Sequence, residues 1–398
     1  MNELKYAKVI ARLMIGLMKK DIVLPGLINT SYNQDFEGKE SGDTIRITKK
    51  TTFVAKDFVD QIEIQSIKEG ETSLTLNIHK DVSFALKSKE RKLETPADRN
   101  AFATRFLEPA VQALTEAMEE EIVKSVYAVP NFIEGLATTP ASLGDLSKIT
   151  ATLNKAGFPK KGRTLVVSSF DEAAMISNIP QLSDASKSGS LGLEGVTEAN
   201  VGRIAGLDVY SSPFLNEAIE FGNKVEAMTV KTGFDLVAAE VATVPVEDGL
   251  VAGETLLEGD IIQFTNGARA AVAADITFTG TSDVISVLNL TNDVPATTEF
   301  QKVGKDGTLG SLGGQAKNFV FHRDAIAMAT VPLDEAEAGE GVVETFYYDP
   351  ATNLTIRVAK WYDGDTKTHK YSLDYLAGVK VVDLRKIYLV NGLQAAIA

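Results

Sequence analysis

Acid–base or metal chemistry in this chain would have to come first from its three histidines, His79, His322 and His369. They lie far apart in the sequence, and none has the HExxH, HxH or HxxxH spacing that brings two imidazoles to one metal. The run His322-Arg323-Asp324 has the residue types of a catalytic trio. Because consecutive residues on a strand point to opposite faces, these side chains are not expected to converge. We therefore expect this run to have a structural role at a strand edge.

Two other runs share features with ligand-binding loops but are incomplete. Asp363-Gly364-Asp365 has two carboxylates but lacks the further ligands of a calcium loop, so a turn is expected. Residues 310–314 (GSLGG) are rich in glycine, but no GK[ST] follows and no clear strand and helix flank them, which excludes a phosphate loop. The sequence therefore predicts no catalytic residue, no cofactor and no metal site, and the protein is not expected to be an enzyme.

The composition excludes further classes of function. Cysteine is absent from the 398 residues, which rules out disulfides, thiolate metal sites and cysteine nucleophiles. The net charge is −14, from 40 basic and 54 acidic residues. Because phosphate contacts need clustered Lys and Arg, such a chain is expected to be a poor general nucleic-acid binder, although it can form a wall around nucleic acid. The apolar stretch of residues 14–18 is too short to span a bilayer, so no membrane partner is expected.

The first ninety residues change from a helical to an alternating pattern. Apolar residues spaced three and four apart predict an amphipathic helix over residues 4–18, and Pro25-Gly26 ends any helix there. Period-two alternation over residues 44–48, 61–64 and 74–86 predicts long antiparallel strands, with a polar turn at residues 68–71. Since a hairpin of this length is not stable alone in water, it must pack on its own domain or on a neighbouring subunit.

The strongest helical pattern follows, over residues 97–127. Thr95 is a plausible N-cap, with Pro96 near the start of the helix. A helix of this length would be about 45 Å long, and Pro109 inside it is expected to kink or split it. The acidic residues 119–121 are expected to form a solvated face. The apolar stripe at four-residue steps consists of Phe102, Phe106, Ala110, Leu114, Met118, Ile122 and Val126.

The next region is predicted to be a compact α/β stretch. It has a helix over residues 143–156, a buried strand over 163–168 and a short helix through Ile179 that Ser169 or Asp171 would cap. The serine-rich residues 183–190 are expected to form an exposed loop. A turn and a strand are expected over residues 203–213.

The rest of the chain is richer in strands. Strand-like runs separated by Gly, Asn and Asp turns predict a small β-barrel or sandwich; they cover residues 225–230, 255–265, 270–278 and 284–290. Beyond these, an apolar strand or short helix (318–331), a hairpin around Asp349-Pro350 (343–348 and 354–361) and terminal strand material (371–390) are expected.

Several stretches carry a family resemblance when taken in order. They are GRTLVVSSFD at residues 162–171, GRIAGLDVYSSP at 202–213, FHRDAIAMA at 321–329 and YLAGVKVVD at 375–383. Together with the preceding long helix and hairpin, this order resembles the HK97-fold major capsid proteins of tailed bacteriophages. The β-rich segment between Pro213 and Phe321 makes the P22-like coat proteins, which carry an insertion domain, the most similar group.

The resemblance implies an α+β, HK97-like capsid fold with an inserted β-barrel-like domain. Its parts would be an N-terminal arm (1–37), an extended β-hairpin loop (38–92), a spine helix (93–130), a peripheral and axial region in two parts (131–221 and 317–398) and the insertion (222–316). In some family members an extended-loop lysine forms an isopeptide bond with another subunit. Here Lys56 and Lys68 lie in that segment without an identifiable partner, so ordinary solvated lysines are expected.

The function implied by the resemblance is structural. The chain would self-assemble into hexamers and pentamers of an icosahedral head that encloses double-stranded DNA without sequence-specific binding. A procapsid would form in the host cytoplasm and expand on maturation. Expected partners are further copies of the chain, a separate scaffolding protein and a portal protein, with decoration proteins as an additional candidate. An encapsulin-type compartment shell is the alternative; a mixed α/β hydrolase and a secreted β-rich adhesin are weaker rivals.

Overall fold

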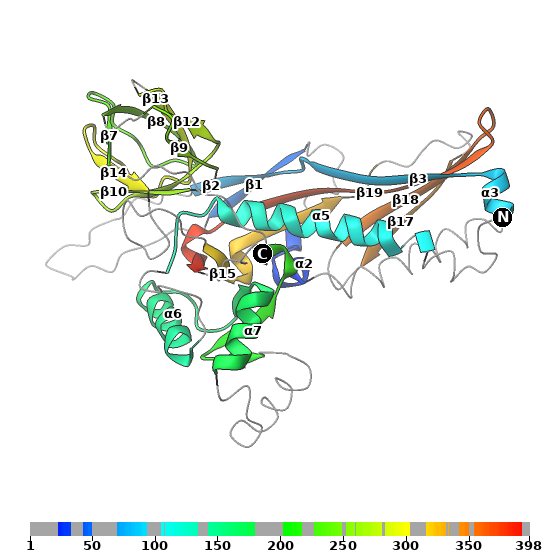
Figure 1. Cartoon of the computed structure of the whole chain (residues 1–398), viewed down its shortest axis with the longest axis horizontal. Coiled ribbons are helices and arrows are strands. Elements are labelled where there is room, and N and C mark those ends of the chain that lie inside the picture. The colour runs from blue at the N-terminus through cyan, green and yellow to red at the C-terminus, as the bar shows by residue number, and fades with distance from the viewer. Residues whose placement is uncertain are drawn as a thin grey trace, which may run out of the picture. The chain divides into compact units, whose positions relative to one another are not determined.

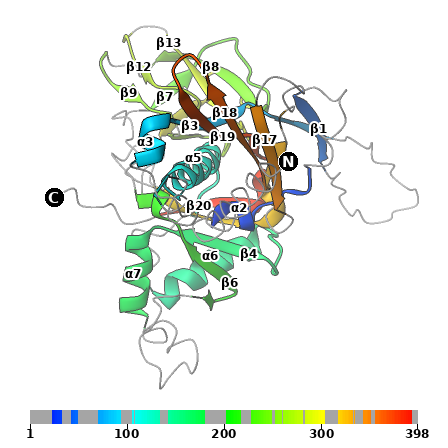
Figure 2. The same cartoon turned by 90° about the vertical axis from the view of Figure 1, so that its right-hand side faces the viewer.

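The chain divides into two compact units (Figures 1 and 2). Unit 1 contains the chain up to Glu119 together with Ile326–Asp383, and unit 2 contains Glu120–Ala325 together with the C-terminal segment from Leu384. The computed structural model describes residues 23–32, 43–49, 70–93, 105–106, 108–133, 142–179, 202–216, 227–248, 252–258, 260–280, 283–302, 316–331, 333, 342–349 and 354–391.

Unit 1 is built on a five-stranded antiparallel sheet around its longest strand, β19. One edge of β19 pairs with β3, and the other edge pairs first with β18 and then with β16. β17 lies outside β18 and pairs along its whole length, as the predicted hairpin requires. The strands are β3 (Ile78–Lys87), β16 (Ile326–Val331), β17 (Val342–Asp349), β18 (Leu354–Asp363) and β19 (Thr368–Val381).

The first part of helix α5 (Glu108–Tyr127) contributes the buried face that packs in unit 1. Leu114 and Met118 are buried there, and just before the helix the Phe106 ring stacks on Phe84 of β3 at 6.2 Å. Pro109 lies in the first turn of α5, where a residue has no intrahelical bond for its N–H to lose. The kink or split predicted at Pro109 stays a prediction. Thr95, Pro96 and residues 97–104 of the predicted helix lie outside the described residues.

Unit 1 also contains a separate two-stranded ribbon. β1 (Thr44–Lys49) and β2 (Gly70–Thr75) pair antiparallel, which confirms these strands. Gly70 and Glu71 begin β2 opposite Lys49 and Thr48, so the predicted turn does not include them. The strand predicted over residues 74–86 is divided at Leu76-Asn77 into β2 and β3, which pair with different strands. Residues 61–64, Lys68 and Glu69 lie outside the described part, as does the N-terminal helix predicted over 4–18.

Short helices complete unit 1. They are α2 (Leu24–Leu27) and α3 (Ser88–Leu93), and α3 continues directly from the end of β3. Gly378 of β19 lies against the ribbon so closely that a Cβ at this position would clash with the backbone carbonyl of Thr75. The ribbon therefore approaches β19 at a point where only glycine fits.

The α/β part of unit 2 is a five-stranded sheet in the order β20-β15-β4-β6-β5. Its central pair, β4 and β6, is parallel, and the other pairs are antiparallel. Apolar residues of α6 and α7 pack with the sheet in one core that includes Leu146, Leu165 and Met175. The elements are α6 (Leu143–Lys155), β4 (Arg163–Val167), α7 (Ser169–Asn178), β5 (Arg203–Ile204), β6 (Leu207–Ser211), β15 (Ala316–His322) and β20 (Ile387–Asn391).

The sequence predicted most of this part correctly. The helix over 143–156 and the buried strand over 163–168 are confirmed within a residue at each end. The cap of α7 is Ser168 rather than Ser169 or Asp171, because β4 ends one residue earlier and the Ser168 Oγ accepts the Asp171 N–H. Residues 318–331 are neither one strand nor a helix: a 3₁₀ turn, Arg323–Ala325, separates β15 in unit 2 from β16 in unit 1.

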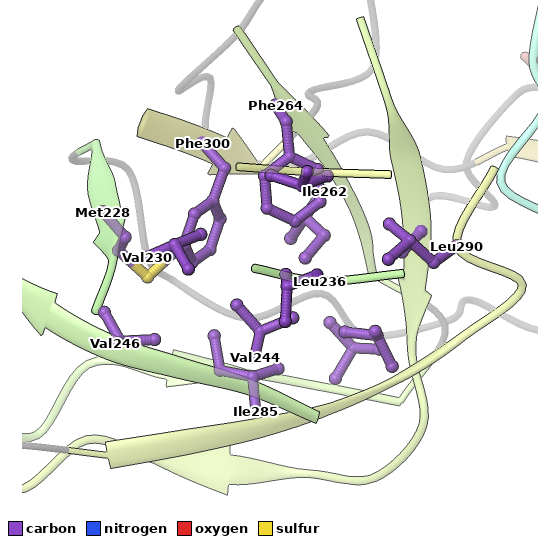
Figure 3. Close-up of a cluster of buried hydrophobic side chains, with 14 of the residues drawn as sticks. Met228, Val230, Leu236, Val244, Val246, Ile262, Phe264, Ile285, Leu290 and Phe300 are labelled. Carbon is purple, nitrogen blue, oxygen red and sulfur yellow. The ribbon is translucent and has the colours of Figure 1, made fainter. Parts of the chain in front are cut away.

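The β-rich segment forms a closed barrel in the order β10-β11-β13-β8-β7-β14, as one of the two predicted arrangements required. Figure 3 shows the side chains of its core converging, with Phe264 and Phe300 5.0 Å apart between ring centroids. The strands are β7 (Met228–Val230), β8 (Val241–Asp248), β10 (Ile261–Phe264), β11 (Arg269–Val272), β13 (Asp283–Leu288) and β14 (Glu299–Lys302), and a separate ladder pairs β9 (Thr255–Leu256) with β12 (Ile276–Thr277).

The predicted strand boundaries in the barrel were less accurate. β8 and β14 were not predicted, and the expected strands over 255–265 and 270–278 are each divided into two. The sequence pattern did not predict β8 because it contains Pro245, and a proline argues against a central strand. In the structure Pro245 pairs with Val284 of β13. On the other side of β8, the pairing with β7 has a register shift between Thr229 and Val230. Across the described helices, none is long and apolar enough to cross a membrane.

Candidate functional site

The three histidines do not form a common site. His79 of β3 and His369 of β19 belong to unit 1, where the pairing of Leu86 with His369 and of His79 with Leu376 places them on opposite faces of the sheet. His369 lies beside the Tyr362 ring, and His322 belongs to unit 2. Among the described residues no group of three or more His, Asp or Glu side chains could hold a metal ion.

His322 and Asp324 meet, contrary to the expectation that this run would not converge. β15 ends at His322, and the 3₁₀ turn that follows brings Asp324 back, so that its carboxylate lies 3.6 Å from His322 Nδ1. The Asp324 N–H donates to the same nitrogen at 3.3 Å. The intervening Arg323 is exposed and is not a nucleophile. The structural role at the end of a strand is therefore supported, although the reason given by strand alternation was wrong.

Asp363 belongs to a turn, as predicted. Its Oδ1 accepts the N–H groups of Asp365 and Thr366, and its Oδ2 accepts from Lys370 Nζ at 2.9 Å. The Lys370 hydrogen bond, followed by those from Thr366, lowers the pKa of Asp363 well below its usual range. The turn joins β18 to β19. Residues 310–314, 183–190, Lys56 and Lys68 lie outside the described part of the chain.

Buried polar side chains that hold distant segments together are the distinctive features of the described residues. Glu119 is fully buried, and its Oε1 accepts the N–H groups of Val23 at 2.6 Å and of Leu24 at 3.2 Å. The expectation that residues 119–121 form a solvated face is therefore wrong for Glu119. It holds for Glu120, which is exposed and pairs with Lys124 at 2.7 Å.

The segment that Glu119 holds also joins the sheet of unit 1. The Asn29 N–H donates to the Ile326 carbonyl at 3.0 Å, and the Met328 N–H donates to the Asn29 carbonyl at 2.9 Å. Asn29 therefore forms a parallel bridge with Ala327 of β16. The two anchors fix residues 23–32 on their own unit by backbone hydrogen bonds that do not depend on the side chains of the segment.

A charged cluster crosses three strands on one face of the sheet of unit 1. Asp374 of β19 is buried and receives two hydrogen bonds from Arg357 of β18, one of them 2.9 Å from Nε. His79 Nε2 of β3 lies 3.2 Å from the second carboxylate oxygen. Asp81 lies directly opposite Asp374 and accepts from the Ser83 hydroxyl at 2.8 Å. Bidentate pairing with Arg357 satisfies the buried carboxylate and ties β18 to β19.

A second polar anchor lies in the α/β part of unit 2. Ser168, Asp171 and Asn318 are all fully buried. The Asp171 carboxylate accepts from the Ser168 hydroxyl at 2.7 Å and from the Asn318 amide at 2.8 Å, while the Ser168 N–H donates to Asn318 Oδ1 at 2.9 Å. This network joins the start of α7 to β15.

The barrel has its own buried pair. Lys302 of β14 and Asp260 are fully buried, with Nζ and Oδ1 3.8 Å apart. Burial lowers the pKa of Lys302, and the Asp260 charge opposes this shift. Asp260 also accepts the Leu257 N–H at 2.9 Å, which holds the turn before β10.

The barrel also contacts the residues that follow α5. The Asn289 amide donates to the Ala128 carbonyl at 2.8 Å, and the Arg269 guanidinium lies 4.3 Å from the centre of the Phe132 ring. The Ile133 N–H in turn donates to the Leu389 carbonyl of β20 at 2.9 Å. Residues 128–133 therefore connect the barrel to the five-stranded sheet within unit 2.

Two valines are exposed on the outside of the barrel. Val244 and Val246 of β8 point into the core, so the alternate positions point outward. Val241 is 67% exposed, and Val284 on the paired strand is 54% exposed. The pair of Thr243 and Ser286 lies between these two valines, so they do not form one continuous apolar patch.

Two of these features were missed in the sequence, and one left a signal there. Glu119 lies three residues before Ile122 and four after Thr115, which places it on the buried stripe of α5. A carboxylate on an apolar stripe indicates a buried anchor and not a solvated face. The importance of Asp374 left no local signal, because its partners lie on other strands.

Comparisons with known proteins concern the fold. No protein-family model and no curated protein matches this chain. A solved structure from Mycobacterium phage Che8 is 14% identical, covers 94% of this chain and 92% of that chain, and has a TM-score of 0.50. The capsid structure of the cyanophage P-SCSP1u is 10% identical, covers 94% and 89%, and has a TM-score of 0.45. A virus-like particle from Pyrococcus furiosus is 7% identical, covers 98% and 99%, and has a TM-score of 0.43.

The similarity to the Che8 structure extends over nearly the whole of both chains. At 14% identity it shows a shared fold. The chain is therefore a strand-rich α/β protein whose fold is similar to that of a phage structure.

Proposed function

We propose that this chain is the major capsid protein of a tailed bacteriophage, with an HK97-like fold. It would self-assemble into hexamers and pentamers of an icosahedral head that encloses double-stranded DNA. The observation that carries the proposal is the fold similarity to the Che8 phage structure over 94% of the chain.

The segments proposed for this fold correspond to described elements. α5 would belong to the spine helix of residues 93–130, and β1 with β2 would form the base of the extended loop of residues 38–92. The barrel would be the inserted domain of residues 222–316, which supports the P22-like subtype. The boundaries at 37, 92, 130, 221 and 316 are part of the proposal.

The physical properties of the subunit suit assembly from many weak contacts. Buried anchors such as Glu119 and Asp374 hold long-range partners within one chain, so that a subunit keeps its shape while it is bound by neighbours. Exposed apolar residues such as Val241 on the barrel offer contact surfaces. Head-to-tail contacts that close into rings would generate the capsomers.

The proposed life cycle and partners follow from this role. The chain would form a procapsid in the host cytoplasm with a separate scaffolding protein and a portal protein, expand on maturation and remain in the virion, with decoration proteins as additional candidate partners. The alternative is an encapsulin-type compartment, which is also a shell but holds protein cargo instead of DNA.

Negative-stain electron microscopy of the purified full-length chain tests the proposal. We expect tubes, spirals or irregular shells from the chain alone, and closed shells of uniform size when the neighbouring genes are co-expressed. Nuclease-protected DNA inside particles from infected cells would favour the phage head, and protein cargo would favour the compartment. A monomer or dimer under every condition would contradict both forms of the proposal.

A further inference from the structure

Three segments of unit 2 meet at one end of the five-stranded sheet. Residues 155–163 lead into β4, residues 322–325 follow β15, and residues 384–387 lead into β20. The pairing of His322 with Arg163 and of Phe321 with Ile387 places all three at the same end. The first two segments also touch, since a Cβ on Gly162 would lie 3.3 Å from the His322 ring.

This end of the sheet is strongly basic in a chain with a net charge of −14. The three segments contain one acidic residue, Asp324, which lies beside His322, and a second, Asp383, directly precedes the third segment. Within the described part of the chain no acidic side chain forms an ion pair with Lys160 or Lys161, and both are exposed. The basic end contains seven basic residues: Lys155, Lys160, Lys161, Arg163, Arg323, Arg385 and Lys386.

The loop that presents the two lysines is held in one conformation. The buried Arg163 guanidinium donates to the carbonyls of Pro159 at 2.6 Å and Phe158 at 2.8 Å. Gly157 has a φ of +73° and ends α6 in a Schellman motif, with the Phe158 N–H bonded to the Leu153 carbonyl. The loop is therefore ordered before any ligand arrives, which reduces the entropic cost of binding.

The chemistry of this surface fits a polyanion better than a folded protein. Protein interfaces are centred on buried aromatic and apolar anchors. The large apolar residues that are exposed in the described chain, such as Phe170 and Tyr210, lie outside the three segments, and Phe158 inside them is buried. Lysines on a preformed loop offer point charges for phosphate without any group that would distinguish one base from another.

We propose that the basic end of the five-stranded sheet is a contact for the phosphate backbone of double-stranded DNA. The inference rests on the proposed capsid function and specifies which surface of the subunit meets the enclosed DNA. Contacts would be few and independent of sequence, so that each subunit holds the DNA weakly and the acidic remainder of the chain does not.

The test measures binding of a short fluorescent DNA duplex to the purified full-length chain as salt is varied. We expect Lys160→Ala/Lys161→Ala to weaken binding. The negative slope of log K against log salt should become shallower by about 1.8, since each lost phosphate contact removes about 0.9 from its magnitude. Lys160→Arg/Lys161→Arg should restore both. The matched control is Lys89→Ala/Lys92→Ala on α3 of unit 1, which removes the same charge from exposed lysines and should leave the slope unchanged.

Electron microscopy of the same preparations separates the two proposals. If shells form and the Lys160/Lys161 variant keeps the wild-type slope, the DNA contact is overturned while the capsid function stands. An equal loss in the Lys89/Lys92 control would also overturn it, because the effect would then be net charge. Variant shells that assemble wrongly while the slope is unchanged would point to an acidic protein partner and overturn the DNA contact.

Discussion

The barrel of unit 2 and the β1–β2 ribbon of unit 1 are both antiparallel, but their cores have different origins. Among the described residues, the barrel core contains 17 buried apolar residues, all contributed by its own segment from Met228 to Phe300. The cluster under the ribbon has five described residues, and three of them come from the far part of the chain: Ala327 and Ala329 of β16, and Val382 just after β19. The barrel therefore carries its own core, whereas the ribbon depends on residues from the far end of the chain.

This difference shows how one chain can combine a domain that has its own core with segments that are ordered only by packing on other parts of the chain. A closed barrel has no free edge and buries its apolar residues itself. A two-stranded ribbon is not stable by itself, so its order follows from what it packs against. Residues 23–32 resemble the ribbon in this respect, because Glu119 and β16 hold them.

The largest effect is expected from emptying the barrel core. Phe264→Ala removes a ring that is 1% exposed and packs against Phe300, and it should lower the free energy of unfolding by about 3–5 kcal/mol. Phe234→Ala is the control, since that ring is 50% exposed on the same barrel and should cost less than about 0.5 kcal/mol. Urea unfolding of both variants makes the comparison, and equal losses would show that the barrel core does not carry its stability.

The next effect tests the dependence of residues 23–32 on Glu119. Glu119→Ala removes a buried carboxylate that accepts two backbone N–H groups, and a loss of about 2–3 kcal/mol is expected. Glu120→Ala is the neighbouring control and should cost about 0.3–0.5 kcal/mol, because it removes only an exposed pair with Lys124. Limited proteolysis near Val23 should be faster in Glu119→Ala alone; equal protection in both variants would mean that the carboxylate is not the anchor.

A third change separates the ribbon from β19. Gly378→Ala places a Cβ against the Thr75 carbonyl, and overpacking of this kind should cost about 1–3 kcal/mol. Hydrogen exchange should rise in β1 and β2 before it rises in the barrel. Gly364→Ala, in the open turn between β18 and β19, meets no neighbouring atom and is the control. Unchanged protection of the ribbon in Gly378→Ala would refute its dependence on this approach.

The smallest effect concerns the hairpin turn at Asp363. Because the Lys370 hydrogen bond lowers the pKa of Asp363 in the folded state, its contribution to stability is present above the ordinary carboxyl pKa near 4. That contribution is lost progressively as the pH falls below this value toward the folded pKa. Asp363→Asn should therefore lower the Tm slightly at neutral pH and converge with the wild type in acid. A Tm difference that is constant across this range would show that the charge plays no part.

Local signals in the sequence predicted local structure well. The helix over 143–156 and the strand over 163–168 were recognisable because their apolar residues have the right period and the flanking residues end each element. The barrel was predicted as a class, but β8 was not, since Pro245 within it weakens the strand pattern. The candidate sites were predicted less well, because Glu119 and Asp374 depend on partners that no local pattern reveals.

The sequence alone determined the periods, the turns and the absence of cysteine chemistry, because each of these depends on residues close together in the chain. Only the tertiary structure decided that β3 pairs with β19, that Glu119 is buried and that Asp324 turns back to His322. His79 and Asp374 are 295 residues apart, and what joins them is the packing of a whole unit. Contacts between residues so far apart in the sequence depend on how several helices and strands pack together, and the residue pattern of one segment does not predict that packing.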